Sequence, residues 1–113
     1  MIVGVGIDIV DLNRFNTIAD NKKFREQYFS ETESQLNTLS LAGRFACREA
    51  LYKAVGSHGQ FDWEDIEVVN TDSGAPKFIF KNTAVKFFES KKIHLSISHV
   101  PEYAISLVII ESD

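Results

Sequence analysis

Two acidic residues lie in stretches where a carboxylate is unusual. Asp8 interrupts the apolar run Met1–Val10, and Glu49 lies in the Ala- and Leu-containing segment 43–56. A carboxylate in a buried apolar strand is costly unless it pairs with a cation or holds a metal ion. For Asp8 the sequence leaves both explanations open, an ion pair with an internal Arg or Lys and the ligation of a metal ion.

Cations surround the second of these carboxylates. At 3.6 residues per turn Glu49 shares a helix face with Lys53, while Arg44 and Arg48 lie together on a neighbouring face. The simplest interpretation is a solvated Glu49–Lys53 pair that contributes about 0.3–0.5 kcal/mol. Two carboxylates with few other ligands also suit Mg²⁺, which keeps several waters and takes substrate phosphate as a ligand. Nearby cations would bind the remaining phosphate charge, so the combination indicates phosphoryl-type transfer.

Other catalytic arrangements are excluded by spacing. Ser98 and His99 are adjacent in a predicted strand, so their side chains point to opposite faces and cannot form a nucleophile–base pair. The three histidines and the single Cys47 lack the spacing of a zinc site. Gly4 and Gly6 do not belong to a dinucleotide fingerprint, because the third glycine is absent.

The elements that must hold these residues follow from hydrophobic periodicity. We expect a buried strand over 1–10, a short helix from the N-cap Asp11 to about 19, a helix carrying Leu36 and Leu39 that runs into the central helix, and that helix over 43–56 ending at Gly56. A hairpin over 61–80, a helix capped by Asn82 that ends at 91–92, and strands over 93–99 and 103–110 complete the chain. The link 57–60 is turn-rich, and 111–113 should fray.

Composition sets the class of protein. The 113 residues, 44% hydrophobic, predict one α+β domain over 1–113, an antiparallel sheet packed on a long central helix. A net charge of −4 argues against a nucleic-acid partner, and no apolar run reaches the length of a membrane span. The absence of a signal-peptide pattern and the single cysteine, expected to pack inside a helix, predict a cytoplasmic protein.

Three stretches in order resemble one family. They are Gly6–Val10 followed by Arg14, Arg44–Ala50 with Lys53, and Ser96–His99 with Tyr103, and the segments 65–70 and 74–76 resemble the same family's hairpin. Together they look like the holo-acyl-carrier-protein synthases, the small, trimeric type of 4'-phosphopantetheinyl transferase. The match extends over nearly the whole chain.

The resemblance implies a fold, a reaction and roles for individual residues. A member would move the 4'-phosphopantetheine arm of coenzyme A to a serine of apo acyl carrier protein, which serves fatty acid biosynthesis, and release adenosine 3',5'-bisphosphate. Asp8 and Glu49 would bind Mg²⁺ and act with Lys53 in catalysis. Coenzyme A would contact a further set: Arg44, Arg48, Lys53, Gly74, Pro76, Ser98 and His99.

Two protein partners are expected as well. Arg14 is expected to face the acidic carrier, and the basic cluster Lys22, Lys23 and Arg25 is our hypothesis for the rest of that surface, since it contrasts with the negative chain. The family usually forms a homotrimer with active sites between subunits.

The chain departs from the family in two places. Arg48 replaces the usual Lys before the motif Glu, and the segment between Phe29 and Arg44 is shorter than usual. The first change bears on coenzyme contacts and the second on carrier docking. Two other functions are therefore kept open: a catalytically silent module that binds coenzyme A or the carrier, and a magnesium-dependent phosphohydrolase of nucleotides.

Overall fold

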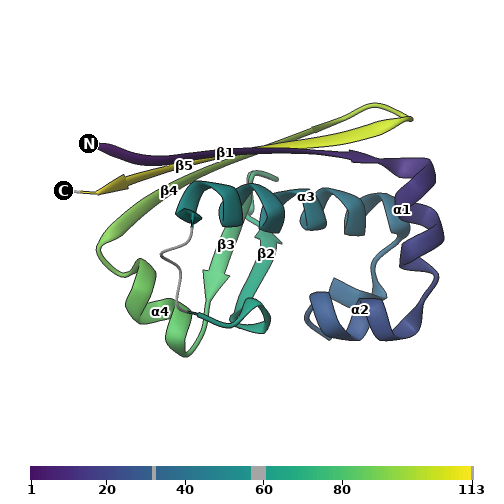
Figure 1. Cartoon of the computed structure of the whole chain (residues 1–113), viewed down its shortest axis with the longest axis horizontal. Helices are drawn as coiled ribbons and strands as arrows, with labels where there is room; N and C mark the ends of the chain where they lie inside the picture. Colours follow the sequence, from purple (N-terminus) through teal and green to yellow (C-terminus); the bar gives the residue numbers. More distant parts are fainter. Residues whose placement is uncertain (32, 57–60, 113) are drawn as a thin grey trace.

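A three-stranded antiparallel sheet covers one side of a long helix (Figure 1). The computed structural model describes residues 1–31, 33–56 and 61–112. The sheet contains β1 (Ile2–Asp11), β5 (Tyr103–Ser112) and β4 (Lys91–His99) in the order β1-β5-β4. The long helix is α3 (Thr38–Val55). The expected α+β fold, an antiparallel sheet on a central helix, is confirmed.

The remaining elements lie on the other side of α3 from the sheet (Figure 1). The helices α1 (Leu12–Ala19) and α2 (Lys22–Tyr28) are followed by the short 3₁₀ turn η1 (Glu33–Gln35). Towards the other end of α3 lie η3 (Trp63–Asp65), the hairpin β2 (Ile66–Asn70) and β3 (Pro76–Phe80), and α4 (Thr83–Phe88). The predicted hairpin is therefore present, with Val68 opposite Phe78.

The central helix has clear start and stop residues. Asn37 is its N-cap, because its side chain accepts a hydrogen bond from the Ser40 N–H at 2.9 Å. The helix ends as predicted at Gly56, whose positive φ of 73° favours glycine. It starts earlier than the predicted 43, and Leu39 belongs to it directly, whereas Leu36 precedes it.

The strand β1 lies against α3 with no side chain between the two backbones. A Cβ on Gly6 would stand 1.8 Å from the Ala50 carbonyl oxygen, and one on Gly4 would stand 2.1 Å from that of Ala54. These glycines therefore permit the close approach that the sequence predicts at this strand. Asp8, two residues further along β1, is brought directly beside the middle of α3.

Three local expectations are corrected. The segment 22–28 forms a helix, α2, that the sequence did not predict, because it buries no residue and so shows no apolar stripe. The C-terminus does not fray at 111–112, because β5 continues to Ser112 and the Met1 amine donates to the Ser112 carbonyl. Asn82 does not cap α4, since its side chain donates to Asp65 Oδ1. The predicted link 57–60 lies outside the described residues.

The core extends along both ends of α3. One cluster joins Phe15, Leu41 and Ala104, and a second joins Leu51, Ile66 and Val108. Cys47 is fully buried between them and packs against Ser106, as the sequence predicts. Burial raises the pKa of its thiol to about 11, so it is not a nucleophile at neutral pH. No helix in the described part of the chain is long and apolar enough to cross a membrane.

Candidate active site

Three of the predicted site residues meet where β1 crosses α3. Asp8 comes from the strand, and Glu49 and Lys53 come one turn apart from the helix. The Lys53 ammonium donates to Asp8 Oδ1 and to the Ile7 carbonyl oxygen, both at 3.0 Å. The Asp8 side chain is only 14% exposed, so the cation offsets a charge that water reaches poorly. The ion pair that the sequence left open for Asp8 is therefore present, and its partner is Lys53.

Glu49 is the less favourably placed of the two carboxylates. Its partial burial and, secondly, the nearby charge of Asp8 raise its pKa, while Lys53 opposes the change. The two carboxylates therefore repel each other, and the single ammonium of Lys53 offsets only part of this repulsion. A divalent cation bound by both carboxylates would stabilise the site.

The donor set fits Mg²⁺. Both candidate ligands are carboxylate oxygens, which magnesium prefers. Within the described ranges, no three His, Cys, Asp or Glu side chains lie close enough together to form a complete metal site from protein ligands. A cation bound by Asp8 and Glu49 would therefore complete its shell with water and substrate phosphate. Such a shell, with few protein ligands and several waters, is typical of magnesium and differs from the four protein ligands of a structural zinc ion.

A cavity of about 400 Å³ opens beside this pair. Asp8 and Glu49 line it together with Arg14, which comes from α1. Its apolar lining includes Phe15, Ile18 and Phe45. Asp11 caps α1 as predicted, accepting from the Asn13 N–H at 3.0 Å, and so holds Arg14 in the first turn of the helix. The structure thus places the predicted carrier-facing arginine at the same cavity as the two carboxylates.

A second groove, of about 260 Å³, collects four of the residues expected to contact coenzyme A. Arg44 and Ser40 come from α3, Gly74 and Pro76 from the β2–β3 hairpin, and His99 from the end of β4. Among the described residues, no Asp or Glu lines this groove, whereas Arg44 does. Its charge therefore suits an anionic group.

The two cavities lie on different sides of α3. Glu49 lines the first cavity and Arg44 lines the second, and at 3.6 residues per turn their side chains leave the helix about 140° apart. In the sheet, Asp8 belongs to the edge strand β1 and His99 to the other edge strand β4, with β5 between them. These two cavities are called half-sites below.

Two residues expected at coenzyme A lie elsewhere. Ser98 is exposed on the face of β4 opposite to Ile97 and His99, which line the groove. Arg48 is 3% exposed, and its guanidinium makes a two-point ion pair with Glu33 and donates to the Ile66 carbonyl oxygen at 2.6 Å. Arg48 therefore does not line the second groove, but it lines a separate cavity of about 160 Å³ together with Glu49.

The predicted basic surface is only partly free. Arg14 and Lys23 are exposed, and Lys22 is exposed and pairs loosely with Glu26 at 3.8 Å. Arg25 instead turns inward, where its Nε donates to the Ala19 carbonyl at the end of α1. It helps to terminate that helix.

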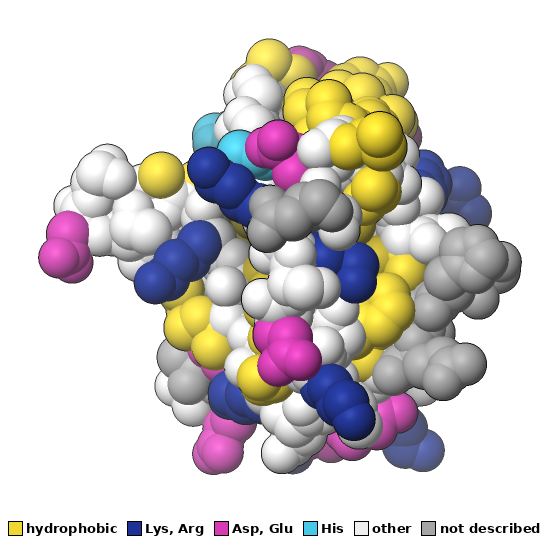
Figure 2. Space-filling view, turned by 90° about the vertical axis from the view of Figure 1, so that its left-hand side faces the viewer, with side chains coloured by type: hydrophobic (Ala, Val, Ile, Leu, Met, Phe, Trp, Pro, Cys, Tyr) yellow, Lys and Arg dark blue, Asp and Glu magenta, His cyan; other side chains and the backbone are white. Residues whose placement is uncertain are grey.

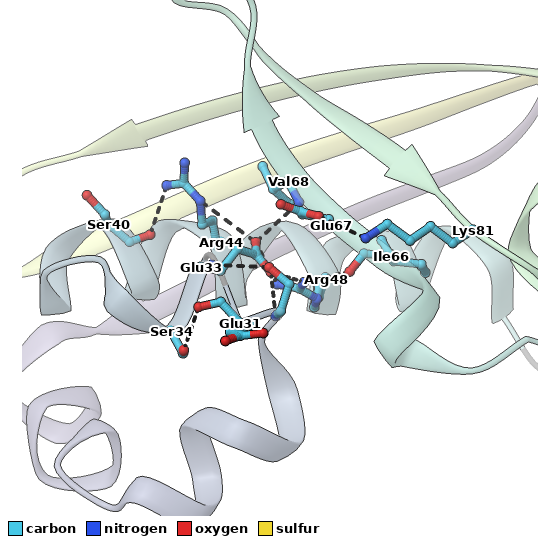
Figure 3. A network of polar contacts seen from close by, with 11 residues as sticks. Glu31, Glu33, Ser34, Ser40, Arg44, Arg48, Ile66, Glu67, Val68 and Lys81 are labelled. Carbon is cyan, nitrogen blue, oxygen red and sulfur yellow. Dashed lines mark hydrogen bonds and ion pairs between the residues drawn. The ribbon is translucent and has the colours of Figure 1, made fainter.

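Sequence reasoning missed Glu33, which is 1% exposed and lies at the centre of a polar network (Figure 3). Glu33 Oε1 accepts from the Ser30 N–H, and Ser30 Oγ accepts from the Glu33 N–H, both at 3.1 Å. This is a capping box, and its Ser-x-x-Glu spacing was the available signal. That spacing gives no sign, however, that the carboxylate is buried among arginines.

Comparisons with known proteins agree on one family. A family model described as the 4'-phosphopantetheinyl transferase superfamily matches residues 4–108. The holo-[acyl-carrier-protein] synthase of Oceanobacillus iheyensis is 43% identical over 122 aligned positions, covering 99% of this chain and 98% of that protein. The one of Leifsonia xyli subsp. xyli is 38% identical and covers 100% and 99%. The first alignment is longer than the 113 residues of this chain, as expected if a segment is shortened.

Solved structures show the same fold. The holo-(acyl-carrier-protein) synthase of Bacillus anthracis, in complex with CoA (3',5'-ADP), superposes with a TM-score of 0.82 at 41% identity, covering 100% of this chain and 99% of that one. The enzyme of Neisseria meningitidis gives a TM-score of 0.88 at 26% identity over 99% and 100% of the two chains. Since the similarity extends from end to end in both sequence and fold, this chain belongs to the 4'-phosphopantetheinyl transferase superfamily.

Proposed function

We propose that this protein is a holo-[acyl-carrier-protein] synthase. It transfers the 4'-phosphopantetheine arm of coenzyme A to a serine of apo acyl carrier protein and releases adenosine 3',5'-bisphosphate. The observation that carries the proposal is the cluster of Asp8, Glu49 and Lys53, in a chain similar over its full length to enzymes of that name. A module that only binds coenzyme A would have no use for two adjoining carboxylates.

The reaction is an in-line displacement at the phosphorus that carries pantetheine. The serine oxygen forms the new P–O bond while the bond to the departing adenosine bisphosphate breaks, and the serine proton passes to a base or water. Lys53 stabilises the charge that develops on the leaving group. Arg44 and His99 hold the nucleotide end of the coenzyme in the second groove.

Mg²⁺ is the proposed cofactor, held by Asp8 and Glu49. When bound, it neutralises charge on the pyrophosphate and orients it for attack. The proximity of the two carboxylates and the raised pKa of Glu49 support this assignment. With a metal ion held by Asp8, Lys53 would be able to leave that carboxylate and interact with phosphate.

A homotrimer with active sites between subunits is the proposed assembly. Two observations support it. The half-sites face away from each other across α3, so one coenzyme molecule reaches both only if two chains contribute. The outer face of the sheet exposes Val3, Val5, Ile7, Ile9 and Leu107, each 39–62% accessible. Figure 2 shows hydrophobic side chains gathered at the top of the molecule, where the sheet lies in Figure 1.

The carrier is proposed to dock on α1 and the start of α2. Arg14 borders the cavity of Asp8 and Glu49, and Lys22 and Lys23 continue the exposed positive charge from there. An acidic carrier would thereby present its serine near the two carboxylates. The proposed location is the cytoplasm, where thiols such as Cys47 stay reduced.

Intact-mass spectrometry tests the function directly. Apo acyl carrier protein is incubated with this protein, coenzyme A and Mg²⁺, with a parallel sample containing a chelator. A mass gain of one phosphopantetheine arm that disappears with chelator is the expected result. Coenzyme A that binds without carrier modification would instead identify a silent binder, and cleavage of coenzyme A without modification would identify a phosphohydrolase.

A further inference from the structure

Glu33 joins three elements through one buried carboxylate (Figure 3). Its Oε2 accepts from Arg48 Nη1 on α3 and from the Val68 N–H on β2, both at 3.2 Å. Its Oε1 accepts from Arg48 Nη2 and from the Ser30 N–H. Both oxygens therefore accept hydrogen bonds, and an N–H or O–H group in place of either oxygen would face a donor. A neutral amide would place N–H against N–H at this site.

The same carboxylate faces Arg44. The Arg44 Nε lies 3.8 Å from Glu33 Oε2 and has no hydrogen-bond partner among the described residues, although it is buried. Arg44 Nη1 donates to the Ser40 carbonyl at 3.4 Å, and Ser40 and Arg44 both line the second groove. Glu33 thus attracts the Nε side of the Arg44 guanidinium, and Arg44 also lines the groove.

The network also joins the two walls of this groove. One wall is α3, which carries Arg44, and the other is the hairpin, which carries Gly74 and Pro76. Glu33 accepts from Val68 in β2, and Arg48, which Glu33 holds, donates to Ile66 in the same strand. Because these bonds lie at the base of the hairpin, they set its distance from the helix.

The charge balance favours an anion in the groove. Glu33 is one carboxylate between two guanidinium groups on successive turns of α3, so the described cluster retains one positive charge. Arg48 is more completely paired and more buried than Arg44, with side-chain exposures of 4% and 14%. The unbalanced charge is therefore the one on Arg44, next to the groove.

We propose that Glu33 is a positioning residue for coenzyme binding. It holds Arg44 in the orientation that receives a phosphate of the nucleotide end, and it fixes the groove between α3 and the β2–β3 hairpin. This inference rests on the proposed function, since it requires that the groove receives coenzyme A. It assigns a role in the reaction to a residue that does not contact the reacting atoms.

The experiment compares Glu33→Asp and Glu33→Gln with Glu31→Gln, an exposed glutamate of the same segment. Binding of coenzyme A and of adenosine 3',5'-bisphosphate is measured by isothermal titration calorimetry, and turnover with apo carrier is measured at saturating coenzyme A. Glu33→Asp, which keeps the charge but withdraws it by one methylene, should raise both Kd values about tenfold while kcat changes less than about threefold. Glu31→Gln should match the unchanged protein.

A double-mutant cycle with Arg44 separates positioning from general loss of structure. Arg44→Ala should weaken coenzyme binding much less in the Glu33→Asp background than in the unchanged protein, because Arg44 is already misplaced there. Each variant is assayed well below its measured melting temperature, so a variant that unfolds is recognised before binding is interpreted.

Four results bear on the proposal, three against the role of Glu33 and one against the proposed function. Equal Kd values for folded Glu33→Asp and the unchanged protein would overturn it, as would additive effects of the two substitutions. A lower kcat with unchanged Kd values would also contradict the proposal, since it would mean that fewer molecules are active while coenzyme binding is unaffected. If the unchanged protein binds neither probe, the proposed function itself fails.

Discussion

At the residue scale, Asp8 and Glu49 are stabilised very differently. Asp8 has Lys53 at 3.0 Å, whereas Glu49 has a raised pKa from partial burial and from Asp8. In the absence of a metal ion, the folded protein therefore binds a proton on Glu49 more tightly than the unfolded chain does. The carboxylate that we assign to Mg²⁺ is one whose charge works against folding.

We predict that Glu49→Gln abolishes most activity but stabilises the fold. Turnover should fall by about 100-fold or more, because a direct metal ligand is lost. With EDTA present, the melting temperature of Glu49→Gln should exceed that of the unchanged protein at pH 8. Between the ordinary carboxyl value of 4.5 and the raised pKa, the unchanged protein loses stability as pH rises, so the difference should vanish below that range.

Scanning calorimetry at several pH values checks the second half of this prediction, and the mass-spectrometric assay checks the first. A melting temperature that falls at pH 8, or turnover that stays unchanged with saturating Mg²⁺, would show that Glu49 has another role.

We predict that Arg14→Glu selectively weakens use of the carrier. The KM for carrier protein should rise about tenfold at low salt, because a favourable long-range attraction becomes repulsion, and the effect should shrink as salt increases. The KM for coenzyme A should stay the same. Lys86→Glu, an equal charge change at an exposed position of α4, is the matched control. Equal effects of the two substitutions would place the docking surface elsewhere.

Residue types and spacing predicted that Asp8, Glu49 and Lys53 belong together, but they did not predict the buried network around Glu33. Asp8, Glu49 and Lys53 are predictable, because a charged residue in an apolar strand and an i,i+4 pair are visible in the sequence. The burial of Glu33 is not, because it depends on α3 and β2 meeting at one point. The same contact makes Arg48 internal, although its place in the motif implies contact with coenzyme A.

At the scale of elements, the contact between β1 and α3 determines the site. The two glycines of β1 allow the strand backbone to touch the helix backbone, so Asp8 and Glu49 approach each other without an intervening layer of side chains.

We predict that Gly6→Ala disrupts this contact. The new Cβ would lie 1.8 Å from the Ala50 carbonyl, so the strand and helix must separate, at a cost of about 1–3 kcal/mol or more in the free energy of unfolding. Turnover should fall more than stability explains, because Asp8 moves with the strand. Chemical denaturation and the Mg²⁺ dependence of turnover measure the two effects.

Gly43→Ala serves as the stability control. Its new Cβ would meet only Ile97 Cγ2 at an ordinary 3.6 Å, inside a helix where Ala is preferred. It should be neutral or stabilising by up to about 1 kcal/mol. Similar destabilisation by both substitutions would contradict the special role of the close contact.

Elements with strong periodicity or clear end signals were predictable from sequence, whereas elements without such signals were not. The helix α3, the hairpin and the Asp11 cap follow from local patterns. The helix α2 has no buried residue to give it a stripe, and its cap Asn21, which accepts from the Lys23 N–H at 2.9 Å, resembles any loop asparagine. The end of β5 is polar but is held by pairing of Lys92 with Glu111.

At the scale of the whole molecule, the proposed trimer would make activity a property of the assembly, because two chains would supply the two half-sites of one active site. We predict that mixing Asp8→Asn with His99→Ala chains, each inactive alone, restores activity after co-refolding. An active site is intact only when one chain supplies an unaltered Asp8 and its neighbour supplies an unaltered His99. Each condition is met in half of the cases, so random mixing should recover about a quarter of the unchanged activity. Light scattering confirms that the mixed species has the same mass as the unchanged protein.

No recovery from well-folded mixed assemblies would show that one chain completes its own site. Val5→Glu, on the exposed outer face of the sheet, provides an independent check, because it should dissociate the assembly and abolish activity together.

The glycine contact of β1 with α3 also sets how the site can change over evolutionary time. Where side chains separate two elements, a substitution that changes their volume also shifts the elements that pack on them. Here β1 and α3 approach through their backbones at Gly4 and Gly6, so no core side chain separates them at these positions. Substitutions among the other core residues should therefore change the spacing of Asp8 and Glu49 less than a substitution of either glycine would.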